Sequence, residues 1–248
     1  MRVILAVLVL VAAPAAVAGS IPAPTMLPSP GFPAPAPQVS SGTAQLVLVS
    51  SRYRDPGTLP PDRPAPPAWA PNSYLGEQLE SAIRQRGAVF LVYGGRFLVG
   101  ANPRNEGLRY GFDFTAYTQP PNRADFERLT WAREVQRVLY VSNSHFTYAS
   151  QTSGRNAYLS AIDLETKKQL WRSPALVANA HTFVVTGDLI VAGYGFTAEP
   201  DFLYLLDRRT GKVLDRLAVP SAPEVIKLRG DLLHVRTYDR QLVVKLRR

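Results

Sequence analysis

The three histidines of the chain, His145, His181 and His234, are its clearest candidates for metal chemistry. Three imidazoles can hold zinc and leave a fourth position open for water or substrate. They do not occupy equivalent positions among the strand-like segments around them, so three separately hydrogen-bonded histidines are the alternative interpretation. The sequence has no G-x-S-x-G, S-x-x-K or H-E-x-x-H motif, no P-loop and no EF-hand loop. We therefore predict no catalytic residue, no metal ligand and no cofactor-binding residue.

Four aromatic residues are candidates for binding instead. Phe146 and Tyr148 lie in the segment SHFTYAS, and Tyr194 and Phe196 lie in GYGFTAE. Both segments are rich in small and hydroxyl-bearing residues and should end hairpins on one loop face of a β fold. Aromatic rings beside hydroxyls bind sugars or peptides by stacking and hydrogen bonding. Packing between neighbouring sheets is the alternative role for the same rings.

An internal repeat indicates which elements hold these residues. The stretches 158–172 (YLSAIDLETKKQLWR) and 202–216 (FLYLLDRRTGKVLDR) lie 44 residues apart and are identical at six of fifteen positions. Repeats of about 40–45 residues built from strands and tight turns are typical of propeller blades. The repeat therefore predicts an all-β array.

The conserved turn of the two copies has a physical explanation. An aspartate at the first turn position accepts hydrogen bonds from backbone N–H groups just ahead, a threonine adds another, and the next residue takes a left-handed conformation. Gly211 suits that position, whereas Lys167 bears a Cβ penalty there. The turn residues that we predict to be structural are Asp163, Thr166, Lys168, Asp207, Thr210 and Gly211.

The form A-x-D-x-x-T-G-K-x-x-W resembles the blade signature of the pyrroloquinoline-quinone (PQQ)-like β-propeller repeat family. The first copy supplies Ala161, Asp163, Thr166, Lys168 and Trp171, and the second has Asp215 where the family has tryptophan. The resemblance implies that Trp131 and Trp171, 40 residues apart, pack between blades. Catalytic family members are calcium- and quinone-dependent dehydrogenases with many more blades, and no cofactor residue carries over. Non-catalytic members are scaffolds for protein assembly in the cell envelope.

Further hairpins of the same period predict about four blades, covering residues 88–131, 133–175, 180–220 and 223–248. The last of these lacks a fourth strand. The strand-like run Gln45 to Ser50, within an isolated segment 44–52, could complete it and close the ring. An extra strand on the side of an open arc is the alternative.

The N-terminal region predicts export followed by spacers. Residues 1–18 have the charged start, apolar core and small-residue cleavage site of a signal peptide, and the apolar run is too short to span a bilayer. The chain has no cysteine, which excludes a lipid-anchored processing site and disulfides. Residues 19–43 are a predicted Pro/Ala-rich spacer. Residues 53–87 are a predicted Pro-rich loop with one short helix, whose apolar stripe includes Leu75, Leu79 and Ile83 and covers the β core or docks a partner.

The charge balance limits the class of partner. The net charge is +9, and most of the excess lies in residues 202–248, which hold eleven Lys or Arg against five Asp or Glu. Such a field attracts anionic polymers or lipid headgroups, while export argues against nucleic acid. We therefore expect a periplasmic or secreted, non-enzymatic β-propeller that binds a protein or an anionic envelope component, with no transmembrane segment after cleavage. A small carbohydrate-active or lactonase-like enzyme with an axial metal is the alternative.

Overall fold

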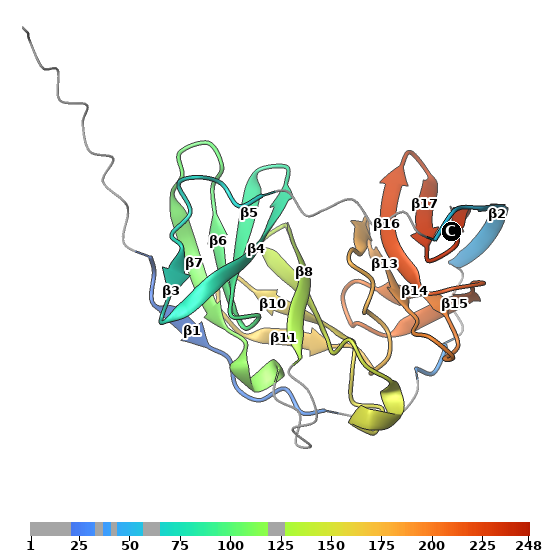
Figure 1. Ribbon diagram of the computed structural model, residues 1–248, viewed down its shortest axis with the longest axis horizontal. Helices are drawn as coiled ribbons and strands as arrows, with labels where there is room; N and C mark the ends of the chain where they lie inside the picture. Colours follow the sequence, from blue (N-terminus) through green and yellow to red (C-terminus); the bar gives the residue numbers. More distant parts are fainter. Residues whose placement is uncertain (1–20, 33–36, 41–43, 57–64, 119–126) are drawn as a thin grey trace, which may run out of the picture.

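The computed structural model describes residues 21–32, 37–40, 44–56, 65–118 and 127–248. The signal peptide predicted at 1–18 lies outside these residues. The regular secondary structure of the described chain is almost entirely strand, as predicted, with two short 3-10 helices, η1 (Thr115–Tyr117) and η2 (Ala149–Thr152). Figure 1 shows four sheets that follow one another along the long axis of the molecule in chain order.

The first sheet has six strands in the order β1-β7-β6-β5-β4-β3 and curls strongly. Its central strand β5 reads AVFLVY, and all six residues are buried, so it is apolar on both faces. Gly94 and Gly95 both have positive φ values and connect β5 to β6 through a tight hairpin. The strands are β1 (Pro24–Met26), β3 (Ser73–Tyr74), β4 (Glu77–Gln85), β5 (Ala88–Tyr93), β6 (Phe97–Ala101) and β7 (Leu108–Asp113).

The second and third sheets are antiparallel and four-stranded, in the orders β11-β10-β9-β8 and β12-β13-β14-β15. The second consists of β8 (Arg128–Val135), β9 (Val138–Ser144), β10 (Tyr158–Asp163) and β11 (Gln169–Arg172). The third consists of β12 (Val184–Thr186), β13 (Leu189–Tyr194), β14 (Phe202–Asp207) and β15 (Val213–Ala218). The two repeat copies are therefore the outer hairpins β10–β11 and β14–β15.

The fourth sheet is completed by the segment upstream, which is one of the two arrangements that the sequence left open. It contains β16 (Pro223–Arg229), β17 (Leu232–Thr237), β18 (Arg240–Arg247) and, as its last strand, β2 (Gln45–Tyr53). β2 pairs antiparallel with β18, with Leu46 opposite Leu246 and Ser51 opposite Leu242. The backbone N–H of Leu46 also donates to the carboxylate of Asp215 in the third sheet, at 2.7 Å.

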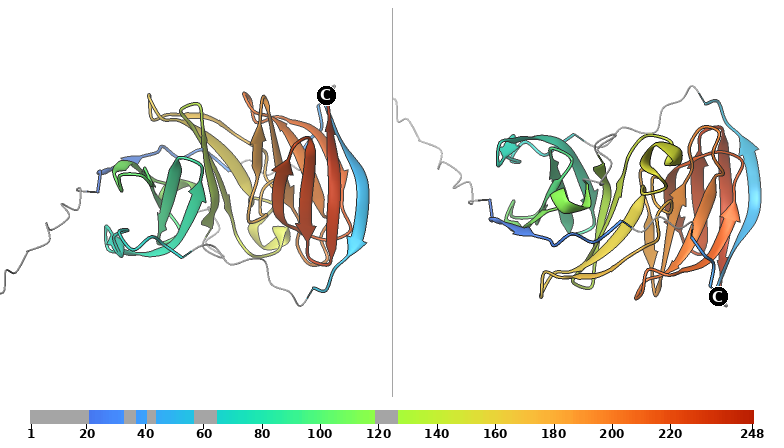
Figure 2. Two further views of the ribbon diagram at one scale, coloured as in Figure 1. Left: turned by 90° about the horizontal axis from the view of Figure 1, so that it is seen from above. Right: turned by 90° about the horizontal axis from the view of Figure 1, so that it is seen from below.

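Completion of the fourth sheet does not close a ring. The first and fourth sheets lie at opposite ends of the molecule in all the ribbon views (Figures 1 and 2). Apolar clusters join the first sheet to the second, the second to the third and the third to the fourth. We call this open row of four sheets the arc.

The helix predicted within 53–87 is wrong, because these residues form the hairpin β3–β4. Leu75 and Gly76 take positive φ values in its turn. A bulge between Leu79 and Ser81 then interrupts the alternation of β4, so three successive residues are buried. Ala82 packs into the cluster on the outer face of the first sheet, and Ile83 packs toward the second sheet. Burial on both faces gives the helix-like spacing, and the first sheet includes β3 and β4, upstream of the predicted start at residue 88.

The predicted spacer 19–43 is also corrected, because its described residues pack along the arc. β1 pairs in parallel with β7, and Leu27 is buried in the cluster between the first two sheets. The ring of Phe32 meets Tyr158 of the second sheet edge to face, and the N–H of Ser40 donates to the carbonyl of Val213 in the third sheet, at 2.9 Å. We call the described residues 21–32 and 37–40 the strap.

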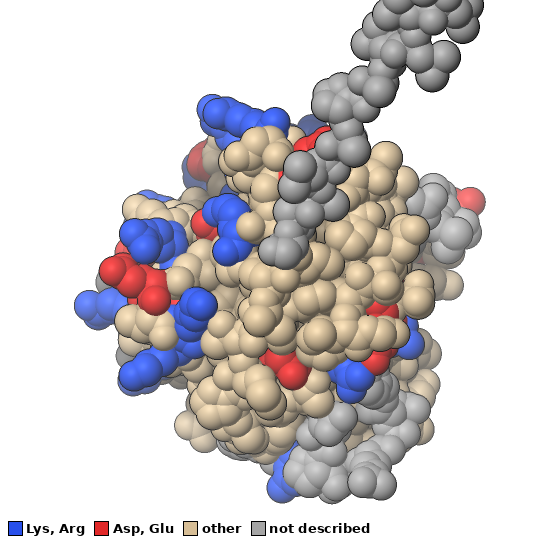
Figure 3. Space-filling view, turned by 90° about the vertical axis from the view of Figure 1, so that its left-hand side faces the viewer, with Lys and Arg blue, Asp and Glu red and all other residues tan. Residues whose placement is uncertain are grey.

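The two ends of the arc differ in character. Trp69, Ala70 and Tyr74 contribute to the apolar cluster on the outer face of the first sheet, so residues upstream of β4 cover that face. Seen from this end, the molecule carries few charged side chains across its centre (Figure 3). The outward face of the fourth sheet has no such cover among the described residues and is lined with basic side chains.

Candidate functional site

Three of the four predicted aromatic residues lie on the loops that follow β9 and β13. The loop after β9 carries Phe146 and Tyr148, and the loop after β13 carries Phe196. The rings of Tyr148 and Phe196 meet edge to face across the two sheets, with 4.9 Å between centroids, and Phe146 stacks on His181 at 6.4 Å. Phe146 is 58% exposed and Tyr148 is 37% exposed. We call these four residues the loop-face cluster.

Tyr194, the remaining predicted aromatic, lies beneath this surface rather than on it. It is buried, and its hydroxyl donates to the carboxylate of Glu199. Burial together with that hydrogen bond raises the pKa of Tyr194 far above its usual value. The other oxygen of Glu199 accepts the backbone N–H of Ala149, at 2.6 Å. One carboxylate therefore ties the loop of the second sheet to that of the third and fixes the spacing of the exposed rings.

Acidic groups lie beside the loop-face cluster. Desolvation raises the pKa of Asp201 to about 6, and the nearby charges of Glu199 and Asp239 act in the same direction. Negative charge gathered beside exposed aromatic rings suits a partner that carries a Lys or Arg side chain, because both features attract cations.

The predicted turn residues adopt the expected geometry. Asp163 accepts the N–H groups of Glu165 and Thr166, each at 2.8 Å, and these bonds lower the pKa of its carboxyl. Asp207 accepts the corresponding N–H groups of Arg209 and Thr210, at 3.1 and 2.8 Å. Lys167 and Gly211 take φ values of 58° and 70°. The side chains of Lys168 and Lys212 are exposed on the turns.

The two tryptophans have different roles. Trp171, in β11, is 7% exposed and packs between the second and third sheets, where its indole N–H donates to the carbonyl of Arg208 at 3.0 Å. Trp131 does not end the first sheet, because it lies in β8, the first strand of the second sheet. It is partly buried against the clusters on both sides of that sheet. The separation of 40 residues therefore does not mark equivalent positions.

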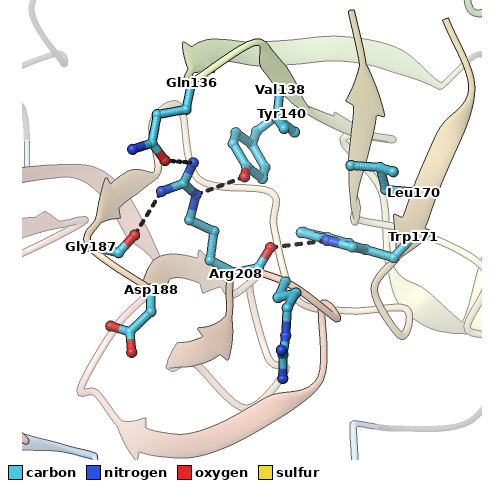
Figure 4. A pocket seen from close by; sticks show the side chains of 9 residues that line it. Gln136, Val138, Tyr140, Leu170, Trp171, Gly187, Asp188 and Arg208 are labelled. Carbon is cyan, nitrogen blue, oxygen red and sulfur yellow. Dashed lines mark hydrogen bonds between the residues drawn. The ribbon is translucent and has the colours of Figure 1, made fainter. Parts of the chain in front are cut away.

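A cavity of about 490 Å³ lies next to Trp171, at the hairpin end of the second and third sheets (Figure 4). The Arg208 guanidinium forms one wall and donates to the hydroxyl of Tyr140 at 2.8 Å, to the carbonyl of Gly187 at 2.9 Å and to the side chain of Gln136 at 2.9 Å. Val138 and Leu170 make much of the remaining wall apolar. The Arg208 guanidinium is already hydrogen-bonded to residues of both sheets, and much of the remaining wall is apolar. The cavity therefore suits an apolar side chain of a ligand better than a polar group that would need a hydrogen-bond partner.

The three histidines are not brought to one place. His145 is buried at the end of β9, His181 lies against Phe146, and His234 lies on β17 opposite Lys227 and Val243. Over the residues that the structure describes, no group of three or more His, Asp or Glu side chains could hold a metal ion. In the same residues, no helix is long and apolar enough to cross a membrane.

A buried charged cluster between the first two sheets was not found from the sequence. Glu127, just before β8, is fully buried and accepts a hydrogen bond from Asn143, and burial raises its pKa to about 8. Arg172 lies near it, surrounded by the rings of Tyr158, Phe32 and Tyr117 at 4.0, 4.9 and 5.0 Å. Burial lowers the pKa of Arg172 to about 10, against the opposing effect of Glu127. No local motif marks this cluster, because its members come from separate segments.

Comparison with known proteins gives a likeness of fold alone. No family model matches the chain, and no curated protein matches it. Among solved structures, the computationally designed proteins Ika8 and Ika4 align with TM-scores of 0.47 and 0.45, at 10% and 11% identity. These alignments cover 68% and 66% of the chain, and 48% and 87% of the designed proteins. BamB from Moraxella catarrhalis aligns with a TM-score of 0.37 at 12% identity, over 66% of this chain and 56% of BamB. The chain spans about half the length of Ika8.

Proposed function

We propose that the protein is an exported, non-enzymatic binding module whose four sheets are PQQ-like propeller blades, and that it binds a protein partner through the loop-face cluster. The blade assignment is supported by the turn geometry at Asp163 and Asp207 and by Trp171 between two sheets. Export is supported by the composition of residues 1–18 alone. A scaffold in the cell envelope is the role that fits both propeller blades and export.

Exposed rings held in fixed positions carry this proposal. Phe146 is 58% exposed, although its neighbours on both sides are held by hydrogen bonds to Asn156. Large aromatic side chains account for much of the binding energy of protein interfaces, and fixed loops lose little entropy on binding. The tie from Glu199 to Ala149 therefore favours a surface that is already arranged for binding.

The acidic groups beside the rings define the partner's chemistry. Desolvation raises the pKa of Asp201 and the charges of Glu199 and Asp239 add to that rise, so a nearby cation would relieve the repulsion among these carboxylates. We therefore expect a peptide segment in which an apolar residue stands next to Lys or Arg.

A peptide-display selection on the purified full-length protein tests this function. Selected peptides should bind the double variant Phe146→Ala/Tyr148→Ala at least tenfold more weakly. Binding to Tyr53→Ala should be unchanged, because that variant removes an exposed tyrosine from β2, away from the loops. Peptides that bind all three proteins equally, or a selection that yields no binder, would overturn the assignment of the loop face.

A separate measurement addresses the enzymatic alternative. We expect no shift in melting temperature when the protein is mixed with PQQ and calcium, because no residue of the chain matches a cofactor-binding position of the family. A ligand present at a hundredfold excess over its dissociation constant would stabilise the fold by about 2.7 kcal/mol. A stabilisation of that size would assign the protein to the enzymatic members of the PQQ-like family.

A further inference from the structure

The fourth sheet has one apolar face and one basic face. The side chains of Ile226, Leu233, Val235 and Val244 point to the third sheet and are buried there. Because side chains alternate along a strand, their neighbours point outward, at the end of the arc. We call six of these neighbours the basic face, namely Arg52, Lys227, Arg229, Arg236, Lys245 and Arg247.

The register of the sheet sets these cations in rows. Arg229 pairs with Leu232, which pairs with Lys245 on the next strand. Arg236 pairs with Gln241, which pairs with Arg52. Paired strands lie about 4.8 Å apart and alternate residues of one strand about 7 Å apart, so neighbouring cations are on the order of 7–10 Å from each other. The result is a sheet face with regularly spaced positive charges.

Acidic side chains neutralise only part of this charge. Glu224 accepts a hydrogen bond from Arg236 at 2.9 Å, and Asp231 lies 3.6 Å from Lys245. Within the described residues, no ion pair involves Arg52, Lys227, Arg229 or Arg247, and all four are exposed. Unpaired like charges repel one another, so an anion that bridges them would be bound favourably.

The remaining residues of the basic face decide between an anionic polymer and a membrane. Leu232, His234 and Val243 stand between the cations and are half-buried, and the exposed apolar side chains of this sheet, Leu48 and Val49, lie on its edge strand β2. A membrane-binding surface would offer exposed apolar side chains for insertion, whereas a charged polymer needs none. The opposite end of a second copy would offer few acidic side chains to these cations, since the centre of that end carries few charged side chains (Figure 3).

We propose that the basic face binds an anionic polymer with phosphate groups along its chain. This surface is separate from the loop-face cluster and does not depend on the function proposed above. Each cation that neutralises a phosphate releases a condensed counterion, so the affinity should fall steeply as salt rises.

The test measures binding of the full-length protein to long-chain inorganic polyphosphate over a series of salt concentrations. The variant Lys227→Gln/Arg229→Gln/Lys245→Gln/Arg247→Gln should bind at least tenfold more weakly and with a shallower salt dependence. The matched control Arg86→Gln/Arg104→Gln/Lys167→Gln/Lys168→Gln loses the same four charges at exposed positions elsewhere. It should bind within about twofold of the unaltered protein, because polyelectrolyte affinity follows the phosphates contacted rather than net charge.

Three results would overturn this proposal. Equal weakening in both quadruple variants would show that net charge alone attracts the polymer. Binding to phosphatidylglycerol vesicles without binding to polyphosphate would show a membrane surface, and no binding to polyphosphate at low salt would exclude the site. The loop-face variant Phe146→Ala/Tyr148→Ala should bind polyphosphate normally, so failure of one proposal leaves the other testable.

Discussion

The indole ring of Trp171 occupies the place that a side chain at position 211 would need. A Cβ built on Gly211 would lie 2.8 Å from Cδ2 and 2.9 Å from Cζ3 of Trp171. Trp171 belongs to the second sheet and Gly211 to the turn between β14 and β15 in the third. The glycine therefore serves the left-handed turn, at φ 70°, and also the close packing of two neighbouring sheets.

Replacing Gly211 should consequently cost more than the strain of a left-handed turn. We expect Gly230→Ala to lower the free energy of unfolding by about 1 kcal/mol, since Gly230 has φ 63° and open space around its Cα. Gly211→Ala should cost at least about 2 kcal/mol more, because Trp171 must move. Urea denaturation measures both, and equal losses would contradict the role assigned to Trp171.

The equivalent position in the first repeat copy should respond in the opposite direction. Lys167 takes φ 58° with a side chain that is exposed. Lys167→Gly should raise the free energy of unfolding by up to about 1 kcal/mol, because glycine adopts this conformation without Cβ strain. Lys168→Gly, at the next position and without positive φ, should be destabilising. The same denaturation measurement compares the two, and a loss in both would mean that strain at Lys167 is negligible.

The turns could be predicted from the sequence because their causes are local. Asp163, Thr166 and the residue after it satisfy one another's hydrogen bonds within four positions. β4 could not be predicted in the same way, because its pattern depends on apolar clusters on both sides of the first sheet. A strand buried on both faces loses the alternation that distinguishes it from a helix.

The residues of the candidate site also differ in whether they could be predicted from local sequence. Phe146, Tyr148 and Phe196 could be placed on a loop face from their flanking Gly, Ser and Thr residues. The cluster of Glu127, Arg172 and Phe32 could not, because it is assembled from the strap and the second sheet. Likewise, the basic face appears only once the register of β18 with β2 and β17 is known.

Glu127 should make stability depend on pH. Its pKa is raised from 4.5 to about 8 in the folded protein. Between these values Glu127 has released its proton in the unfolded chain but retains it in the folded protein. The contribution of Glu127 to stability is therefore fully present below pH 4.5 and is lost as the pH approaches 8. We expect a loss of roughly a few kcal/mol across this window.

Glu127→Gln should remove that loss, since glutamine resembles the protonated form. Asp201, with a pKa raised from 3.8 to about 6, acts in the same direction only at lower pH, so the range from pH 6 to 8 isolates Glu127. Thermal unfolding at pH 6, 7 and 8 should show a falling melting temperature for the unaltered protein and a nearly constant one for the variant. Parallel curves would show that Glu127 is ionised in the folded state.

The strap gives the last prediction, and it concerns a segment whose composition alone suggests a passive linker. Leu27 is 5% exposed within the core between the first two sheets, and the Phe32 ring lies 4.9 Å from the Arg172 guanidinium. Leu27→Ala should lower the free energy of unfolding by about 2–3 kcal/mol through loss of buried apolar area and the cavity left behind.

Phe32→Ala should cost about 1–2 kcal/mol, because it removes one of three rings around a poorly solvated guanidinium. Val39→Ala is the matched control, since Val39 lies in the same strap and is 44% exposed, and it should change stability by less than about 0.5 kcal/mol. Hydrogen exchange should show slow amides in β7, which β1 covers, and faster exchange there when residues 21–32 are deleted. A deletion variant with unchanged stability and unchanged exchange in β7 would restore the interpretation of these residues as a spacer.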